Sequence, residues 1–200
     1  MSALLEQALL EMLAARNGHF RYESGYHSDL WLDLDLLFVR PRAIHPFAAE
    51  LAKQLVKHNI TAVCGPLVGG ALVAQMIAAE LDIAFYYTER FVQPQPGGFY
   101  PVEYRLPEAV RASIQGKRVA ILDDVISAGS AVLGTFADLR SFGVETAAVG
   151  ALLILGDSAR HFFAEQHIPL ESIAARPSNL WPPSECPLCA AQIPLEDLTH

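Results

Sequence analysis

The sequence predicts an α/β fold in which a mainly parallel central sheet is flanked by helices. Between residues 42 and 176, short apolar segments alternate with longer segments of helical periodicity. The apolar segments are rich in β-branched residues, as is typical of parallel strands that helices cover on both faces. With 200 residues and 52% hydrophobic content, the chain is large enough for one domain with a substantial core.

Residues 1–41 predict a small N-terminal region. Apolar side chains recur on one helical face over residues 3–16, and the Asn-Gly pair that follows ends this helix. Leu30, Leu32 and Leu34 then alternate with larger or acidic residues, which is the period of a strand with one buried face.

The core elements follow in alternation along residues 42–176. We expect a helix at 42–58, a strand at 61–64, a helix at 69–80, a strand at 83–88, a strand at 117–123, a helix at 129–142, a strand at 146–155, a helix near 157–166 and a last strand near 169–175. Each strand–helix unit adds one parallel strand to the sheet.

Two segments depart from this alternation. Residues 89–107 are rich in proline and glycine and too long and irregular for a simple connection, which predicts a functional lid or a disordered loop. The proline-rich tail, 177–200, predicts an extended wrap rather than a regular element. We therefore expect a single domain, with 1–41 as an N-terminal hood region, 42–176 as the core and 177–200 as the tail.

Composition excludes several classes of protein. A net charge of −8 without any basic run disfavours a nucleic-acid binder, whose affinity depends on Lys and Arg. The longest apolar stretch, near 147–155, is too short to span a bilayer, and no basic segment precedes an apolar one at the N-terminus. We expect a cytoplasmic protein without a membrane partner, whose three cysteines are reduced.

The strongest functional signal is the run Val119 to Ala131. A buried strand delivers Asp123 and Asp124, and Ser127-Ala128-Gly129-Ser130 then leads into a helix. Backbone N–H groups at a helix N-terminus, together with serine hydroxyls, form a cradle for a phosphate dianion. Paired acids beside a phosphate suit the vicinal hydroxyls of a ribose. The plain alternative is that the acids end a strand and the serines cap a helix.

This run resembles the phosphoribosyl diphosphate motif of the type I phosphoribosyltransferases. The resemblance implies the fold of that family, with Asp123 and Asp124 on the ribose hydroxyls. It implies that the 5-phosphate is bound by Ser127, Ala128, Gly129, Ser130 and Ala131. A second loop, Cys64 to Gly70, lies between a strand and a helix and is similar to the family's pyrophosphate loop. This similarity implies substrate binding by Gly65, Pro66, Leu67, Val68 and Gly69.

The resemblance extends to the orotate phosphoribosyltransferase branch. The segments Gly18-His19-Phe20 and His27-Ser28 look like the N-terminal signature of that branch, which implies base contacts by Phe20 and His27. The branch usually has a lysine where this chain has Glu23, and an Asp-Arg where this chain has Leu155-Gly156-Asp157-Ser158. Arg160 lies nearby, but a surface arginine on a helix is the plainer interpretation.

The implied reaction is transfer of a 5-phosphoribosyl group from its 1-diphosphate to a nucleobase, with Mg²⁺ as the cofactor. The branch has lysines and a histidine in the segment that corresponds to 89–107, and Arg90 is the best candidate in this chain to bind the pyrophosphate. Orotate is the default base of the branch, and uracil or a purine-like base is the alternative. A non-catalytic sensor of phosphoribosyl diphosphate is a further alternative, because the segment 89–107 offers few cations. The resemblance also implies a homodimer.

The cysteines give an incomplete metal signature. Cys186 and Cys189 are spaced as half of a four-ligand zinc site, and Cys64 lies in a distant core segment. A zinc site would need His200, another residue or a second subunit, so no metal-ligating set is predicted from the sequence.

Overall fold

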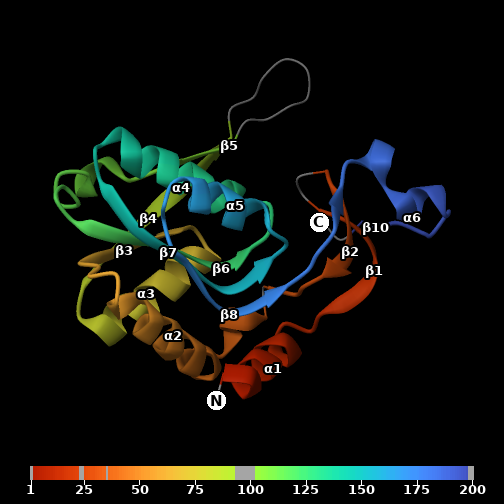
Figure 1. The fold of residues 1–200 in the computed structure, drawn as a ribbon, viewed down its shortest axis with the longest axis horizontal. Helices are drawn as coiled ribbons and strands as arrows, with labels where there is room; N and C mark the ends of the chain where they lie inside the picture. The colour runs from red at the N-terminus through yellow and green to blue at the C-terminus, as the bar shows by residue number, and fades with distance from the viewer. Residues whose placement is uncertain (1, 23–24, 35, 93–101, 198–200) are drawn as a thin grey trace.

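The computed structural model describes residues 2–22, 25–34, 36–92 and 102–197, and it contains two sheets (Figure 1). The larger sheet has six strands in the order β5-β4-β3-β6-β7-β8. All neighbours are parallel except β4 and β5, which pair in antiparallel fashion. The predicted α/β fold with a mainly parallel, helix-covered sheet is confirmed.

The observed core elements lie close to the predicted ones. The strands are β3 (Ala62–Pro66), β4 (Ala84–Val92), β5 (Val102–Arg105), β6 (Arg118–Ile126), β7 (Glu145–Leu155) and β8 (Leu170–Arg176). The helices are α2 (Pro41–Val56), α3 (Gly69–Leu81), α4 (Ser130–Ser141) and α5 (Ser158–Glu165), and short 3₁₀ turns lie at Leu37–Val39, Glu108–Val110 and Pro183–Glu185. Within these described residues, no helix has the length and apolar content needed to cross a membrane.

The two faces of the sheet carry separate hydrophobic cores. Along β6, Ala120 and Leu122 pack in the core that α2 and α3 cover, whereas Val119 and Ile121 pack in the core that α4 and α5 cover. This alternation is the two-residue period of a strand, with both faces buried. The continuous apolar run in the sequence reflects burial on both sides.

A second, four-stranded sheet joins the two ends of the chain (Figure 1). Its order is β10-β1-β2-β9, with β1 at Arg16–Arg21, β2 at His27–Trp31, β9 at Leu180–Trp181 and β10 at Glu196–Asp197. Helix α1 (Ser2–Met12) precedes β1 in the chain, and helix α6 (Pro187–Ala190) lies between β9 and β10. The predicted N-terminal region and the predicted tail therefore pair with each other.

Three expectations about these ends need correction. The first helix ends at Met12, because residues 16–21 form β1, which the sequence did not reveal. The strand expected around residues 30–34 begins earlier, at His27, and ends at Trp31. The tail contains two short strands and a helix rather than a purely extended wrap, because its strands are defined by pairing with β1 and β2 and have no periodicity of their own.

The segment expected to be an irregular lid is a hairpin over its described part. Strand β4 continues to Val92, and β5 pairs with it from Glu89 opposite Arg105 to Val92 opposite Val102. The prolines and glycines that suggested irregularity belong to residues 93–101, which lie outside the described residues. The hairpin makes the edge of the six-stranded sheet.

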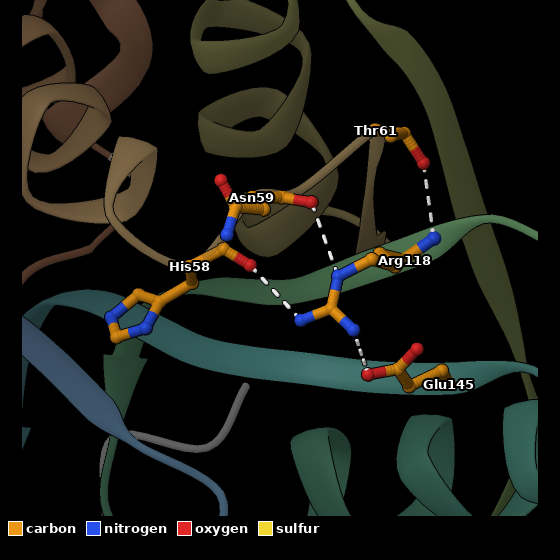
Figure 2. Close-up of polar contacts among 5 residues, drawn as sticks. All are labelled: His58, Asn59, Thr61, Arg118 and Glu145. Carbon is orange, nitrogen blue, oxygen red and sulfur yellow. Dashed lines mark hydrogen bonds and ion pairs between the residues drawn. The ribbon is translucent and has the colours of Figure 1, made fainter.

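Arg118 joins three segments at the start of β6 (Figure 2). Its guanidinium donates to the carbonyl oxygens of Asn59 (3.2 Å) and His58 (3.2 Å), just beyond α2, and it pairs with the carboxylate of Glu145 on β7. The Arg118 backbone N–H also donates to the hydroxyl of Thr61 (3.0 Å). Arginine can serve all these acceptors at once because its donors are arranged in a fixed fork.

We expect Arg118→Ala to lower the free energy of unfolding by about 1–2 kcal/mol, because two carbonyl groups lose their donors. Glu145→Gln should cost less than about 0.5 kcal/mol, since both side chains of this ion pair are exposed to solvent. Urea unfolding of both variants tests this contrast. Equal losses in the two variants would show that the ion pair, and not the carbonyl bonds, carries the stability.

Candidate functional site

The acid pair lies where two neighbouring strands part. Strand β3 pairs with β6 up to Cys64 opposite Ile121, whereas β6 continues to Ile126 against β7. The sequence placed the end of this strand at residue 123, so its pairing with β7 extends further than expected. Asp123 and Asp124 therefore lie on the strand itself, beside the loop that leaves β3.

This position is also where the strand order of the sheet reverses. The chain leaves β3 through α3 toward β4, and it leaves β6 through α4 toward β7, on the opposite side. Loops at the carboxyl ends of two such strands diverge to opposite faces of the sheet and leave a crevice between them, which is the usual ligand site of open α/β sheets. The sequence placed both candidate phosphate loops here.

Both acids are nearly excluded from solvent, with 7% exposure for Asp123 and 8% for Asp124. The backbone N–H of Asp124 donates to Asp123 Oδ1 (3.0 Å), and that of Val125 donates to Asp124 Oδ1 (2.8 Å). Burial raises the pKa of Asp123, and the neighbouring Asp124 raises it further. Burial also raises the pKa of Asp124. Ligand hydroxyls that donate hydrogen bonds to these carboxylates would stabilise their charged form.

Two glycines at the start of α3 make room for the acids. A Cβ atom at Gly69 would overlap the carboxylate of Asp124. A Cβ atom at Gly70 would lie 2.7 Å from Asp123 Oδ1 and 2.8 Å from the carbonyl oxygen of Leu122. The helix N-terminus can thus approach the acid pair because these positions carry no side chain. Gly70 lies in the loop that the sequence singled out, but the expected substrate-binding residues ended at Gly69.

The loop between β6 and α4 has the form of an anion cradle. Gly129, the residue before the helix, has φ +84°, a conformation that favours glycine. A Cβ at Gly129 would also lie 3.2 Å from the Cβ of Ala159 on α5. The hydroxyl oxygen of Ser127 is buried and has no hydrogen-bond partner among the described residues. An orphaned hydroxyl beside an uncapped helix N-terminus suits a bound phosphate.

The loop after β3 lies on the other side of the crevice. The backbone N–H of Leu67 donates to the carbonyl oxygen of Thr88 on β4 (2.9 Å), and the peptide bond between Leu67 and Val68 is cis. The side chains of both residues are exposed. Gly65 lies against the backbone of α3, where a Cβ would be 2.7 Å from the nitrogen of Ala71. This packing fixes the loop against the start of the helix.

Comparison with known proteins identifies this arrangement. Residues 42–167, which include both loops and the acid pair, match the phosphoribosyl transferase domain family. The chain belongs to this family. It is 30% identical over 178 residues to the orotate phosphoribosyltransferase of Caldanaerobacter subterraneus subsp. tengcongensis, covering 89% of this chain and 86% of that protein. It is 27% identical over 195 residues to the protein of the same name from Thermotoga maritima, covering 96% of each.

Solved phosphoribosyltransferase structures share the fold. The orotate phosphoribosyltransferase from Aeropyrum pernix superposes with a TM-score of 0.63 at 24% identity, covering 86% of this chain and 93% of that one. The adenine phosphoribosyltransferase from Thermoanaerobacter pseudethanolicus gives 0.65 at 16% identity, covering 85% and 99%. At these identities the likeness concerns the fold. The predictions of a type I phosphoribosyltransferase fold and of a pentosyltransferase enzyme are confirmed.

Arg90, the cation expected at the leaving group, lies on the hairpin of this phosphoribosyltransferase together with Arg105. Arg90 is exposed on β4, opposite Tyr104 of β5. Arg105 is engaged within the hairpin, because it pairs with Glu103 and its guanidinium lies 5.3 Å from the ring centre of Phe91. Arg160 lies on the surface of α5, with its Nε 4.0 Å from Asp157 Oδ1.

The two residues expected at the base, Phe20 and His27, are buried in the four-stranded sheet. Phe20 is 1% exposed, and its ring packs 5.9 Å from that of Trp31. His27 is 5% exposed and lies beside His19 and the tail cysteines. Base contact by either residue stays a prediction, and it would require the side chain to leave this packing. Glu23, where the branch usually has a lysine, lies outside the described residues.

Proposed function

We propose that this phosphoribosyltransferase transfers the 5-phosphoribosyl group of phosphoribosyl diphosphate to a ring nitrogen of orotate and releases diphosphate. Phosphoribosyl diphosphate is assigned as the phosphoribosyl donor on one observation. The buried acid pair and the Ser127 hydroxyl, which has no hydrogen-bond partner among the described residues, lie in the same crevice. The choice of orotate is supported by the relatives of that name, which align over most of the chain.

In this proposal the β6–α4 loop holds the 5-phosphate. The hydroxyls of Ser127 and Ser130 and the backbone N–H groups from Ala128 to Ala131 donate to its oxygens, and the positive end of the α4 dipole favours its charge. The ribose then lies over β6, where Asp123 and Asp124 accept hydrogen bonds from its 2- and 3-hydroxyls. These charge-assisted bonds fix the sugar in place.

The diphosphate is assigned to the loop from Gly65 to Gly69, at the N-terminus of α3. As the bond from the anomeric carbon to the diphosphate oxygen breaks, positive charge develops on the sugar and negative charge on the leaving group. Backbone N–H groups of this loop and the guanidinium of Arg90 stabilise the negative charge. The base nitrogen attacks the opposite face of the carbon, so the configuration inverts.

Mg²⁺ is part of the proposal, and the donor set of the crevice fits it. Mg²⁺ prefers oxygen ligands and is usually held by one or two carboxylates together with substrate phosphates. Asp123 and Asp124 supply two carboxylates beside both candidate phosphate loops, and no larger acidic cluster occurs here in the described residues. When bound with the diphosphate, the ion neutralises charge on the leaving group.

The assignment of orotate is tested with a panel of bases. We expect kcat/KM for orotate to exceed the values for uracil and adenine by at least about 100-fold, because a site that pairs with polar groups rejects bases that lack them. Diphosphate release is measured with phosphoribosyl diphosphate, Mg²⁺ and each base, and a reaction without base measures hydrolysis.

Two outcomes would overturn the assignment in different ways. A higher kcat/KM for uracil or a purine would replace orotate by another acceptor, in line with the departures at Glu23 and at residues 155–158. Tight donor binding without diphosphate release for any base would favour a sensor. The homodimer implied by the resemblance stays a prediction.

A further inference from the structure

The side chains of His19, His27, Cys186 and Cys189 converge at one point of the four-stranded sheet. The two histidines lie on the paired strands β1 and β2, Cys186 immediately precedes α6, and Cys189 lies within it. One potential ligand atom from each residue lies within 4.8 Å of those of the other three. In the sequence, the two cysteines formed half of a four-ligand zinc signature. In the structure, His19 and His27 lie beside them and complete a set of four ligands.

We propose that these four residues bind one structural zinc ion, which fastens the C-terminal tail to the β1–β2 hairpin. The inference does not depend on the transferase activity, since the cluster is separate from the acid pair and the phosphate loops. Two thiolates and two imidazoles are a common tetrahedral zinc set, and four protein ligands leave no open position for catalysis.

The distances agree with a tetrahedral site. The nitrogens His19 Nε2 and His27 Nδ1 are 3.1 Å apart. Nitrogen-to-sulfur distances are 3.4 Å from His19 to Cys186, 3.7 Å from His19 to Cys189 and 3.3 Å from His27 to Cys189. With Zn–N bonds of about 2.0 Å and Zn–S bonds of about 2.3 Å, a tetrahedron has edges of about 3.3 Å between nitrogens and about 3.5 Å between nitrogen and sulfur.

Hydrogen bonds alone do not account for this convergence. His19 Nδ1–H donates to the carbonyl oxygen of Ile193 (2.8 Å), so the neutral ring has only one lone pair left, on Nε2. Three groups approach that atom within 3.7 Å: His27 Nδ1, Cys186 Sγ and Cys189 Sγ. One lone pair cannot accept from three donors, whereas a cation at the centre would accept electron pairs from all four atoms.

The bond to Ile193 also has the form found around zinc ligands. A histidine that binds a metal through one nitrogen commonly donates its other N–H to a carbonyl oxygen, which fixes the tautomer and the ring orientation. Two thiolates balance the charge of Zn²⁺, so the site is neutral and compatible with burial. His19 and Cys186 are 2% and 3% exposed.

Apart from this cluster, the tail is held by two short strands and by exposed polar contacts. Among the described residues from 177 to 197, Cys186 is the one that is buried. Strands β9 and β10 have two residues each. Outside the cluster, the polar side-chain contacts that join the tail to β1 and β2 are exposed, and they link Arg21 to Asp197, Arg16 to Glu196 and Asp29 to Asn179. A segment without a hydrophobic core commonly depends on a metal or a disulfide for its stability. The proposed zinc site provides that attachment.

Metal analysis tests the proposal on the full chain. We expect protein purified with reductant and without chelator to contain about one zinc per chain by mass spectrometry of the metal. Cys186→Ser and His27→Gln should each reduce this content at least about tenfold. Cys64→Ala and His45→Gln are matched controls that remove a cysteine and a histidine far from the cluster, and both should retain zinc.

A second measurement uses the unmodified chain, in case a variant fails to fold. After zinc is removed with a chelator, added Co²⁺ should give the intense visible bands of tetrahedral coordination and a thiolate charge-transfer band. Thermolysin should cleave the tail at least about tenfold faster in the metal-free chain, and equimolar zinc should restore protection.

Three results would overturn the proposal. One is a reduced, folded chain that takes up neither zinc nor Co²⁺ at one ion per chain. Another is unchanged zinc content in folded Cys186→Ser and His27→Gln variants. The third is a Cys186–Cys189 disulfide, found by alkylation and intact mass, in zinc-free protein isolated from cells.

Discussion

Replacing Asp123 and Asp124 together by asparagine is expected to lower kcat/KM for phosphoribosyl diphosphate by about a thousandfold. Each carboxylate is assigned one charge-assisted hydrogen bond to a ribose hydroxyl, and each such bond contributes about 1.5–3 kcal/mol. Two of them therefore correspond to about 3–6 kcal/mol, a range of about 10² to 10⁴-fold with a thousandfold near its middle. Asparagine preserves the shape of each side chain, so the loss reports on charge.

The double variant and each single asparagine variant should fold at least as stably as the unmodified chain at neutral pH. The pKa of each buried carboxyl is raised above the value it has in the unfolded chain. The folded state therefore binds the proton more tightly, and this stabilisation is present at low pH and lost as the pH rises through the raised pKa. At neutral pH, Asp123→Asn should raise the free energy of unfolding by about 1–3 kcal/mol, the scale for one unfavourably buried polar group.

Urea unfolding at several pH values, with initial rates at pH 7.5, measures both effects. The stability difference should shrink as the pH falls, because the carboxyls of the unmodified chain become protonated. Arg118→Ala is the matched control at the other end of β6, where a loss of stability should leave kcat/KM within about twofold. An unchanged kcat/KM in the double asparagine variant would show that the acid pair does not bind the substrate.

The core sheet could be predicted from the sequence because its signals are local. Strands buried on both faces, such as β6 and β7, are apolar runs that only the acid pair interrupts. The helix between them, α4, buries Val132, Phe136 and Leu139 at helical spacing. The run from Val119 to Ala131 likewise holds the acids and the phosphate loop within one strand–turn–helix unit. For such a unit, neighbours in sequence are neighbours in space.

The four-stranded sheet could not be predicted in this way. Strand β1 contains Gly18 and three charged or polar residues at its exposed positions, and β9 and β10 are too short to show any period. Their existence depends on pairing between the two ends of the chain. The cluster of His19, His27, Cys186 and Cys189 could not be predicted for the same reason, since His19 and Cys186 are 167 positions apart in the sequence.

Gly69→Ala is expected to lower kcat/KM by about a hundredfold, although an alanine in a helix is ordinarily the more stable residue. The new methyl group would overlap the carboxylate of Asp124, whose farther oxygen lies 2.9 Å from the added Cβ. The carboxylate must turn away from its position over β6, and a displacement of about 1 Å in a positioned group costs about a hundredfold in rate. Overpacking should also lower the free energy of unfolding by about 1–3 kcal/mol.

A double-mutant cycle separates this mechanism from a general disturbance of the loop. If the methyl group acts through Asp124, Gly69→Ala should destabilise the unmodified chain but not the Asp124→Ala variant, where the space is free. Urea unfolding of the four proteins gives the coupling energy, and Gly69→Ala combined with Asp124→Ala should be no less active than Asp124→Ala alone. Additive losses in both measurements would instead mean that Gly69 is required for the backbone of the diphosphate loop. The close approach of α3 to the acids would then not be what excludes a side chain at this position.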